Sequence, residues 1–304
     1  MNNRAALEDL KAFISIRTDE ELVWVLHVFN KNVVADRFSE LTRREREISV
    51  LKSDIDNLNS FKQLKEIKNF IIKFCEEYTI SQIDGLIDDL LDFKSEMEVS
   101  GIDFLELKNN IRFLNFACHL MNKEVKEREL KNFKSLYINF LYVSLTYSTY
   151  YKNPRHVERI ISKFSEIHSK HPSHFKDDED KNFYIWAKKY MDENPSYKSK
   201  YYNPIEESDY PIVVNSIFDL LYNENEEVHY ALRRKISNAW YQKKYRQKNK
   251  GKKENYYALT KKAKESLKIL CYKSNLTEEQ VIESLINEHY AKECRDQQNG
   301  QHLY

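Results

Sequence analysis

Apolar residues recur every three or four positions through most of this chain, which is the spacing of helices with one buried face. Only four Gly and five Pro occur in 304 residues, too few for the frequent turns of a β-sandwich, a barrel or a Gly-loop nucleotide fold. The sequence therefore predicts a mainly α protein. Helices are expected over 7–16, 19–29, 61–78, 80–97, 104–121, 124–151, 154–168, 180–192 and 213–222, and from 226 into a basic segment.

A heptad pattern marks the segment 38–75. Leu41, Ile48 and Ile55 recur seven positions apart, and Leu51 occupies the interleaved position. Such a short seam is compatible with two structures. One is a helical hairpin packed on the body of the protein, and the other is a short coiled coil that joins two copies.

The stretch 135–151 has no charged residue. It is shorter than the roughly 20 mainly apolar residues that a membrane-spanning helix needs, so we expect a buried helix and no membrane partner. The N-terminus carries acidic residues and no apolar segment of the secretory kind. The four cysteines lie far apart without a C-x-x-C pair, which favours reduced thiols in a cytoplasmic protein.

Charge is distributed unevenly along the chain. Between Arg233 and Lys253 there are ten Lys or Arg and no Asp or Glu. The part before this basic arm has a net charge of −8, and the part from Glu254 onward has −1. An acidic body followed by a purely cationic stretch is typical of a polyanion-binding arm, although a solvated linker has a similar composition.

The segment after the basic arm combines an alternating stretch with two helix patterns. The short aromatic stretch 254–259 suits a strand. Thr260 is placed to cap a first helix, and Asn275 tolerates the left-handed conformation that closes one. Thr277 with Gln280 forms a capping box for a second helix. One strand and two one-sided helices leave backbone groups and apolar faces uncovered, so we expect two copies to pair.

This β-α-α pattern resembles the ribbon-helix-helix (MetJ/Arc/CopG) superfamily, and the preceding basic arm is similar in placement to the one in MatP, a chromosome-terminus organiser. The resemblance implies a homodimer with a two-stranded ribbon in the major groove of duplex DNA. The DNA-binding residues expected are Arg233, Lys243, Lys244, Tyr245, Arg246, Lys248, Lys250, Lys252, Lys253, Glu254, Tyr256, Ala258 and Thr277. The dimer core expected is Tyr257, Leu259, Leu267, Leu270, Ile282, Leu285 and Ile286.

No enzyme motif is present in the sequence. There is no Gly-rich phosphate loop, no H-E-x-x-H and no G-x-S-x-G. His168, His171 and His174 are spaced three apart, but Pro172 prevents a common helical face for metal ligands. We therefore expect no catalytic residue, no cofactor and no bound metal.

Three regions are predicted: a helical region over 1–200, a helical linker with the basic arm over 201–253, and the ribbon-helix-helix module over 254–304. The function expected is that of a dimeric, cytoplasmic, nucleoid-associated DNA-binding protein, either a transcriptional repressor or a DNA-organising factor. The alternative is a protein-interaction or effector module in the helical region, with a DNA-binding or autoregulatory tail.

Overall fold

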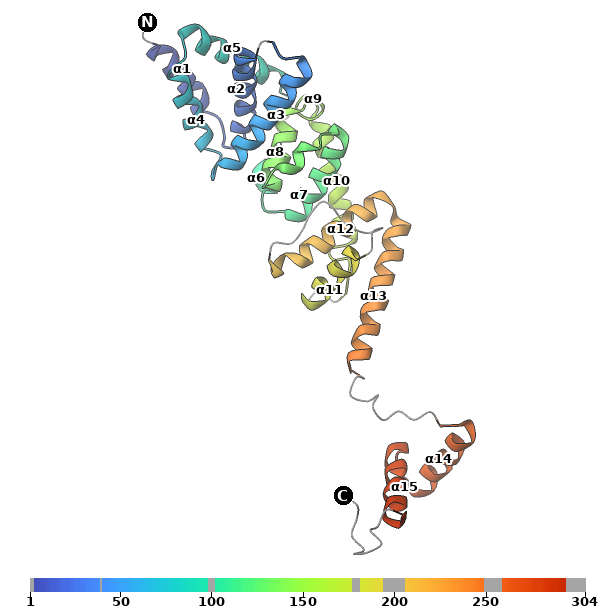
Figure 1. Cartoon of the computed structure of the whole chain (residues 1–304). Coiled ribbons are helices and arrows are strands. Elements are labelled where there is room, and N and C mark those ends of the chain that lie inside the picture. The colour runs from blue at the N-terminus through green and yellow to red at the C-terminus, as the bar shows by residue number, and fades with distance from the viewer. Residues whose placement is uncertain are drawn as a thin grey trace, which may run out of the picture. The chain divides into compact units, whose positions relative to one another are not determined.

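The computed structural model describes residues 3–38, 40–97, 102–176, 181–193, 206–248 and 259–293. Those ranges contain fifteen α-helices, two short 3-10 helices and no strand (Figure 1). The prediction of a mainly α protein is confirmed. The elements are α1 (Arg4–Ser15), α2 (Leu22–Arg37), α3 (Arg43–Ser60), α4 (Glu66–Cys75), α5 (Ile80–Glu96), α6 (Phe104–Leu107), α7 (Ile111–Val125), η1 (Glu129–Asn132), α8 (Leu136–Thr146), α9 (Ser148–Tyr151), α10 (Pro154–Lys170), α11 (Lys181–Asp192), η2 (Glu207–Asp209), α12 (Tyr210–Glu224), α13 (Glu226–Lys248), α14 (Lys261–Ser274) and α15 (Glu278–Glu293).

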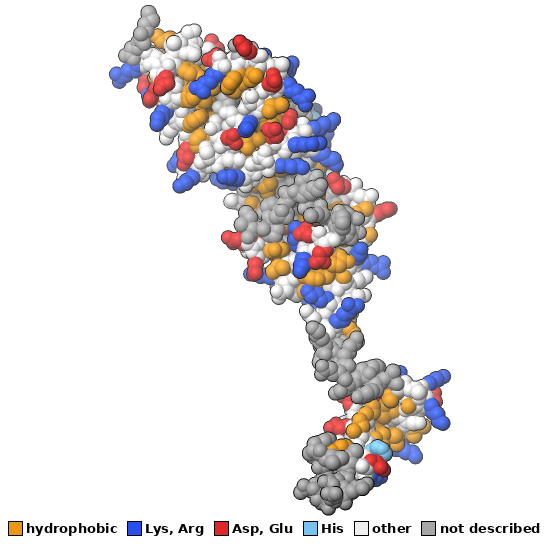
Figure 2. Space-filling view, viewed as in Figure 1, with side chains coloured by type: hydrophobic (Ala, Val, Ile, Leu, Met, Phe, Trp, Pro, Cys, Tyr) orange, Lys and Arg blue, Asp and Glu red, His pale blue; other side chains and the backbone are white. Residues whose placement is uncertain are grey.

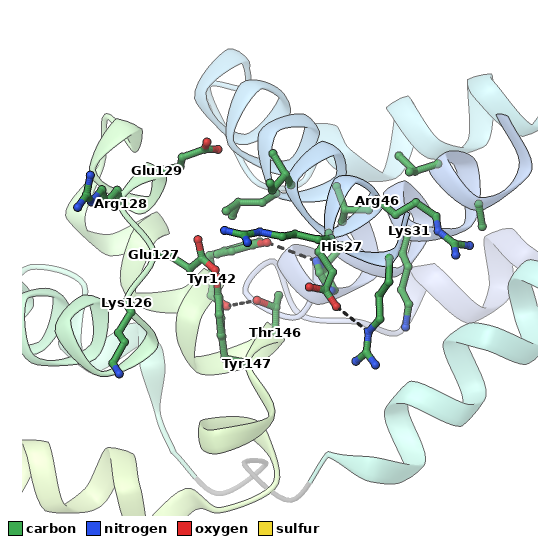
Figure 3. A pocket seen from close by; sticks show the side chains of 18 residues that line it. His27, Lys31, Arg46, Lys126, Glu127, Arg128, Glu129, Tyr142, Thr146 and Tyr147 are labelled. Atoms are coloured by element: carbon green, nitrogen blue, oxygen red, sulfur yellow. Dashed lines mark hydrogen bonds and ion pairs between the residues drawn. The ribbon is translucent and has the colours of Figure 1, made fainter. Parts of the chain in front are cut away.

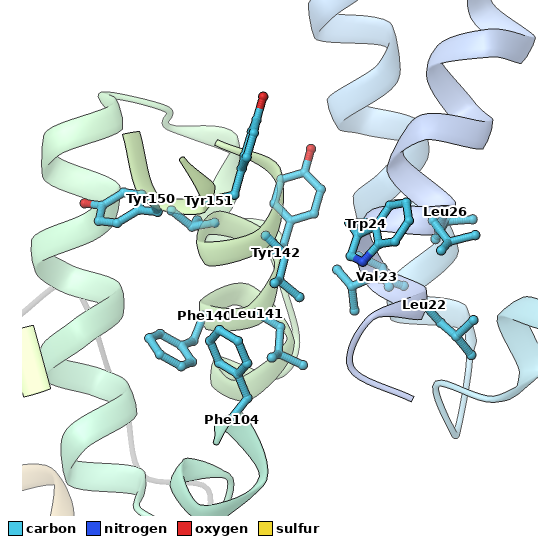
Figure 4. Packing of buried hydrophobic residues seen from close by; sticks show 14 of the residues in the cluster. Leu22, Val23, Trp24, Leu26, Phe104, Phe140, Leu141, Tyr142, Tyr150 and Tyr151 are labelled. Carbon is cyan, nitrogen blue, oxygen red and sulfur yellow. The ribbon is translucent and has the colours of Figure 1, made fainter. Parts of the chain in front are cut away.

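Helices α1 to α10 share one hydrophobic core, with α2 near its centre. Helix α2 packs against α3, α4, α5 and α8. All five residues from Leu22 to Leu26 are apolar and buried, because a helix that is apolar on every side is stable only inside a core. In Figure 4, Trp24 and its neighbours on α2 face Leu141 and Tyr142 of α8.

The heptad segment packs on the body of the protein. Leu51 and Ile55 of α3 are buried, whereas Ile48 is 45% exposed. Helix α3 packs on α2, and α4 packs on both α1 and α2. Leu51 and Ile55 therefore face this chain's own core and are not available to a coiled coil between two copies.

The prediction of a single helix over 124–151 is wrong. Helix α7 ends at Val125, where Lys126 takes a left-handed φ of 58°. The chain passes through η1 before α8 begins behind its N-cap, Ser135. Helix α8 is uncharged and almost entirely buried, as expected. Among the described residues, no helix is long and apolar enough to cross a membrane.

A second hydrophobic cluster joins α11, α12 and α13 through residues that include Phe183, Phe218 and Trp240. Helix α12 also packs against α7 and α10 of the first core. The whole chain divides into two compact units, Met1–Tyr241 and Gln242–Tyr304. Helix α13 begins in the first unit and ends in the second.

The C-terminal unit contains the two helices that the sequence predicts. Helix α14 begins behind Thr260, whose hydroxyl accepts the backbone N–H of Ala263, and ends at Asn275 with φ 55°. The Thr277 hydroxyl accepts the N–H of Gln280, and the Gln280 side chain accepts the N–H of Thr277. Both caps are confirmed because they depend only on residues within one helical turn.

The ribbon-helix-helix assignment is wrong, since the described part of the chain holds no strand. Leu259, the last residue of the expected strand, lies in irregular backbone before α14. Glu254, Tyr256, Tyr257 and Ala258 lie outside the described residues. A strand gains its hydrogen bonds only from a second strand, and a short alternation such as 254–259 carries no information about whether such a partner exists.

Candidate functional site

Helix α13 carries six of the thirteen predicted DNA-binding residues and has one clearly buried face. His229, Leu232, Ile236 and Trp240 are all buried. Their spacings of three and four residues place them on a single stripe. The ring of Trp240 packs at a tilt against that of Trp186 on α11, with 5.0 Å between the ring centroids, which fixes this face against the second hydrophobic cluster.

The opposite face of α13 combines aromatic and cationic side chains. Tyr230, Arg234, Tyr241, Tyr245 and Lys248 follow one another at spacings of four, seven, four and three residues, so they share one stripe at 3.6 residues per turn. We call these five residues the α13 outer face. All five are exposed, with Tyr241 at 71% and Tyr245 at 62%. The described part of the helix has no carboxylate after Glu227.

The other predicted residues on α13 lie outside this stripe. Lys244 and Arg246 are exposed, and Arg233 and Lys243 are half-buried. Lys250, Lys252 and Lys253 lie outside the described residues. Thr277 does not join this set, because it caps α15 within the C-terminal unit. Tyr230, Arg234 and Tyr241 were not among the predicted DNA-binding residues, although helical periodicity alone places them in line with Tyr245.

The hairpin of α14 and α15 leaves most of its apolar residues uncovered. Only Leu267 and Val281 are buried within it. Figure 2 shows hydrophobic side chains gathered on the visible face of this unit. The other predicted dimer-core residues that the structure describes are exposed: Leu259 at 36%, Leu270 at 40%, Ile282 at 36%, Leu285 at 47% and Ile286 at 59%.

The charges of the two hairpin helices are opposite. Helix α14 has five Lys and one Glu, whereas α15 has five Glu and one Lys. Among the described residues, no ion pair joins α14 to α15 within the chain. The two helices therefore present complementary charges that one copy of the hairpin does not pair internally.

Two of the three histidines considered as metal ligands belong instead to a buried hydrogen-bonded cluster. Arg112 of α7 donates to both oxygens of Asp219 on α12, at 2.8 and 2.6 Å. Nε2 of His174 lies 2.8 Å from Asp219 Oδ1, and Nδ1 of His174 lies 2.9 Å from Nε2 of His229. The ring of His171 stacks on that of His174. No group of residues in the described ranges has the arrangement of a metal site.

Burial controls the protonation of this cluster. Burial would raise the pKa of Asp219, but hydrogen bonds from Arg112 and His174 lower it below its usual value. Burial lowers the pKa of His174. Burial and the neighbouring His174 and His171 lower the pKa of His229 to about 3. The two rings are therefore neutral near pH 7, with each Nε2 carrying its proton so that His174 donates to Asp219 and His229 donates to His174.

A cleft of about 1180 Å³ lies in the N-terminal unit between α2, the first turns of α3, the segment after α7 and α8 (Figure 3). Behind it, the carboxylate of Asp54 is completely buried. It accepts hydrogen bonds of 2.7 Å from Asn30, from the Tyr142 hydroxyl and from Nδ1 of His27. Sequence patterns do not reveal this site, because its residues come from distant segments. The one local signal was the row of arginines in RRER at the start of α3.

No protein-family model, curated protein or solved structure matches this chain significantly.

Proposed function

We propose that this protein binds duplex DNA through the outer face of α13 and self-associates through the α14–α15 hairpin. It would act in the cytoplasm as a nucleoid-associated factor that organises DNA or represses transcription. The observation that carries the proposal is the α13 outer face, in which three exposed tyrosines and two exposed cations lie on the side opposite the buried stripe.

The chemistry of this face suits a nucleic-acid backbone. Lys and Arg that contact phosphates release condensed counterions, which drives binding without reading the sequence. An α-helix with its side chains is about 10–12 Å wide, close to the roughly 12 Å width of the major groove. From Tyr241 to the end of α13, Lys243 is half-buried and every other residue is exposed. These last turns therefore leave their side chains accessible to a duplex.

A second copy of the chain is the partner that best fits the hairpin. Leu267 and Val281 are the residues that its two helices bury, which leaves the described part of the hairpin very little core of its own. Pairing α14 of one copy with α15 of another would cover exposed residues such as Leu285 and Ile286. It would also bring the five Lys of α14 against the five Glu of α15.

Fluorescence anisotropy of the full-length protein with a labelled duplex of about 25 base pairs tests the DNA interface. We expect binding that weakens steeply as salt rises, with a log–log slope of about −0.9 for each phosphate neutralised. Single-stranded RNA and anionic lipid vesicles, offered at the same ionic strength, serve as comparison ligands. Absence of duplex binding at low salt, or a clear preference for RNA or vesicles, would contradict the proposal.

A further inference from the structure

The cleft of the N-terminal unit is strongly cationic. Its lining includes Lys31 from α2, Arg43, Arg44 and Arg46 from α3, and Lys126 and Arg128 from the segment after α7. Against these six cations stand three glutamates in the lining. One of them, Glu47, is bonded to Arg43 at 3.0 Å. Since the body as a whole is acidic, cations gathered from three segments indicate a place for an anion.

The arginines of α3 stand where helix energetics disfavours them. Arg43, Arg44 and Arg46 occupy the first turns of the helix, whose N-terminal end carries a partial positive charge. Cations there are unfavourable, by about 0.3–1 kcal/mol each at exposed positions. Thr42 and Glu45 already form a capping box, so the arginines are not needed to cap the helix. A bound anion would offset both the helix dipole and the mutual repulsion of the arginines.

His27 directs an unpaired nitrogen toward the same cleft. Its Nδ1 donates to the buried carboxylate of Asp54 at 2.7 Å, which fixes the ring and leaves Nε2 as the second polar atom. Nε2 has no hydrogen-bond partner among the described residues. The His27 side chain is 19% exposed and lines the cleft. Nε2 is therefore positioned to accept a hydrogen bond from a ligand hydroxyl.

The rest of the lining is apolar and aromatic. Val34, Ile48 and Leu51 form one part of it, and the Tyr142 and Tyr147 rings form another. The volume of about 1180 Å³ exceeds what a simple anion fills and suits a small organic molecule. Apolar walls with a few convergent polar groups are the usual composition of such sites.

We propose that this cleft binds a phosphorylated organic ligand of nucleotide size. Its phosphate groups would lie against the arginines of α3 and Lys126, and its organic part would lie against Tyr147 and the apolar wall. The shared chemistry is a phosphate ester joined to a planar or apolar group. A free nucleotide and the 5′-phosphorylated end of a nucleic acid both supply that chemistry.

Isothermal titration calorimetry of the full-length protein tests this site with ADP, pyrophosphate and adenosine as probes. We expect ADP to bind, pyrophosphate to bind about tenfold more weakly because it lacks the organic part, and adenosine not to bind measurably. The variant Arg44→Gln/Arg46→Gln should weaken ADP binding at least tenfold, because it removes charge-assisted hydrogen bonds to phosphate. The matched control is Arg155→Gln/Arg159→Gln, which neutralises two exposed arginines of α10 outside the cleft and should bind ADP like the wild type.

Competition against ADP identifies the source of the phosphate. Displacement by a 5′-phosphorylated oligonucleotide, but not by its 5′-hydroxyl form, supports a nucleic-acid end as the ligand. Displacement by neither supports a free nucleotide. The proposal is overturned if no probe binds at millimolar concentration, if pyrophosphate binds as tightly as ADP, or if the Arg44 and Arg46 variant binds ADP as the wild type does. Far-UV circular dichroism of each variant verifies that these surface changes leave the helices intact.

Discussion

His174 and His229 share one buried hydrogen bond, 2.9 Å from Nδ1 of the first to Nε2 of the second. Both rings are completely buried. They come from the segment after α10 and from α13, so the bond ties α13 to the segment that follows the first core. Through His174 it continues to Asp219 and Arg112. A chain of polar groups that is mostly buried is sensitive to any change of protonation.

Acid should destabilise the folded protein through this pair. The pKa values of His174 and His229 are lowered in the folded state, so below about pH 6.5 the unfolded chain binds protons that the folded chain does not. The two histidines therefore contribute their full share of the free energy of unfolding above that pH. This contribution falls as the pH drops toward about 3, the pKa of His229. Each histidine contributes at most about 1.4 kcal/mol per pH unit.

Urea denaturation at pH 7, 6 and 5 measures the slope of the free energy of unfolding against pH. In His229→Phe the slope should be shallower, whatever the variant's stability at pH 7, because one proton-binding site is removed from the unfolded state. His289→Asn, at an exposed position of α15, is the control and should keep the wild-type slope. Equal slopes in all three proteins would contradict the role assigned to the buried pair.

Removing Arg112 should destabilise the protein by about 3–5 kcal/mol, because the Asp219 carboxylate would remain buried without its main partner. The comparison is Lys123→Ala, which breaks an exposed pair with Glu224 and should cost at most about 1 kcal/mol. Chemical denaturation of Arg112→Met and Lys123→Ala compares the two directly. A small cost for Arg112→Met would mean that water reaches Asp219.

The cations and tyrosines of the α13 outer face should affect DNA binding differently. Arg234→Gln/Lys248→Gln should flatten the salt dependence by about one log–log unit for each phosphate that the variant no longer neutralises. Tyr241→Ala/Tyr245→Ala should weaken binding while leaving that slope unchanged, because hydroxyl and apolar contacts to base edges release no counterions. Anisotropy titrations at several salt concentrations separate these effects, and Arg155→Gln/Arg159→Gln is again the control. If both α13 variants bind the duplex with wild-type affinity, the α13 outer face is not part of the DNA interface.

Charge reversal tests the pairing of α14 with α15 between copies. Lys264→Glu/Lys268→Glu and Glu279→Lys/Glu283→Lys should each weaken self-association when measured alone, by sedimentation equilibrium at low salt. Mixed together, they should associate again, because each reversed helix then faces a complementary one in the other chain. Association of each variant alone as strong as that of the wild type would exclude this pairing. Leu285→Glu/Ile286→Glu should be a monomer alone and in a mixture with either charge-reversal variant. It places charge in the apolar contact between the two copies.

Local sequence determined the parts of this protein that depend on neighbours within one or two helical turns. The caps at Thr260 and Thr277 and the left-handed closure at Asn275 followed from side chains that bond their own backbone. Helical periodicity of the sequence also placed Tyr245 and Lys248 on α13. It also indicated apolar stripes on α14 and α15 that one copy of the chain does not bury.

Tertiary structure decided what periodicity could not. The strand expected over 254–259 required a partner that local alternation cannot specify, and the described part of the chain contains no strand. Helix α7 ends after Val125 because Lys126 takes a left-handed backbone conformation. A lysine at this position gave no indication of that conformation in the sequence. The clusters around Asp54 and Asp219 join residues from distant segments, such as Arg112 and Asp219, which are 107 positions apart. Burial lowers the pKa values of His174 and His229, and hydrogen bonds formed inside the core lower that of Asp219. Both causes belong to the assembled core, because only packing removes a side chain from water and brings its distant partners together.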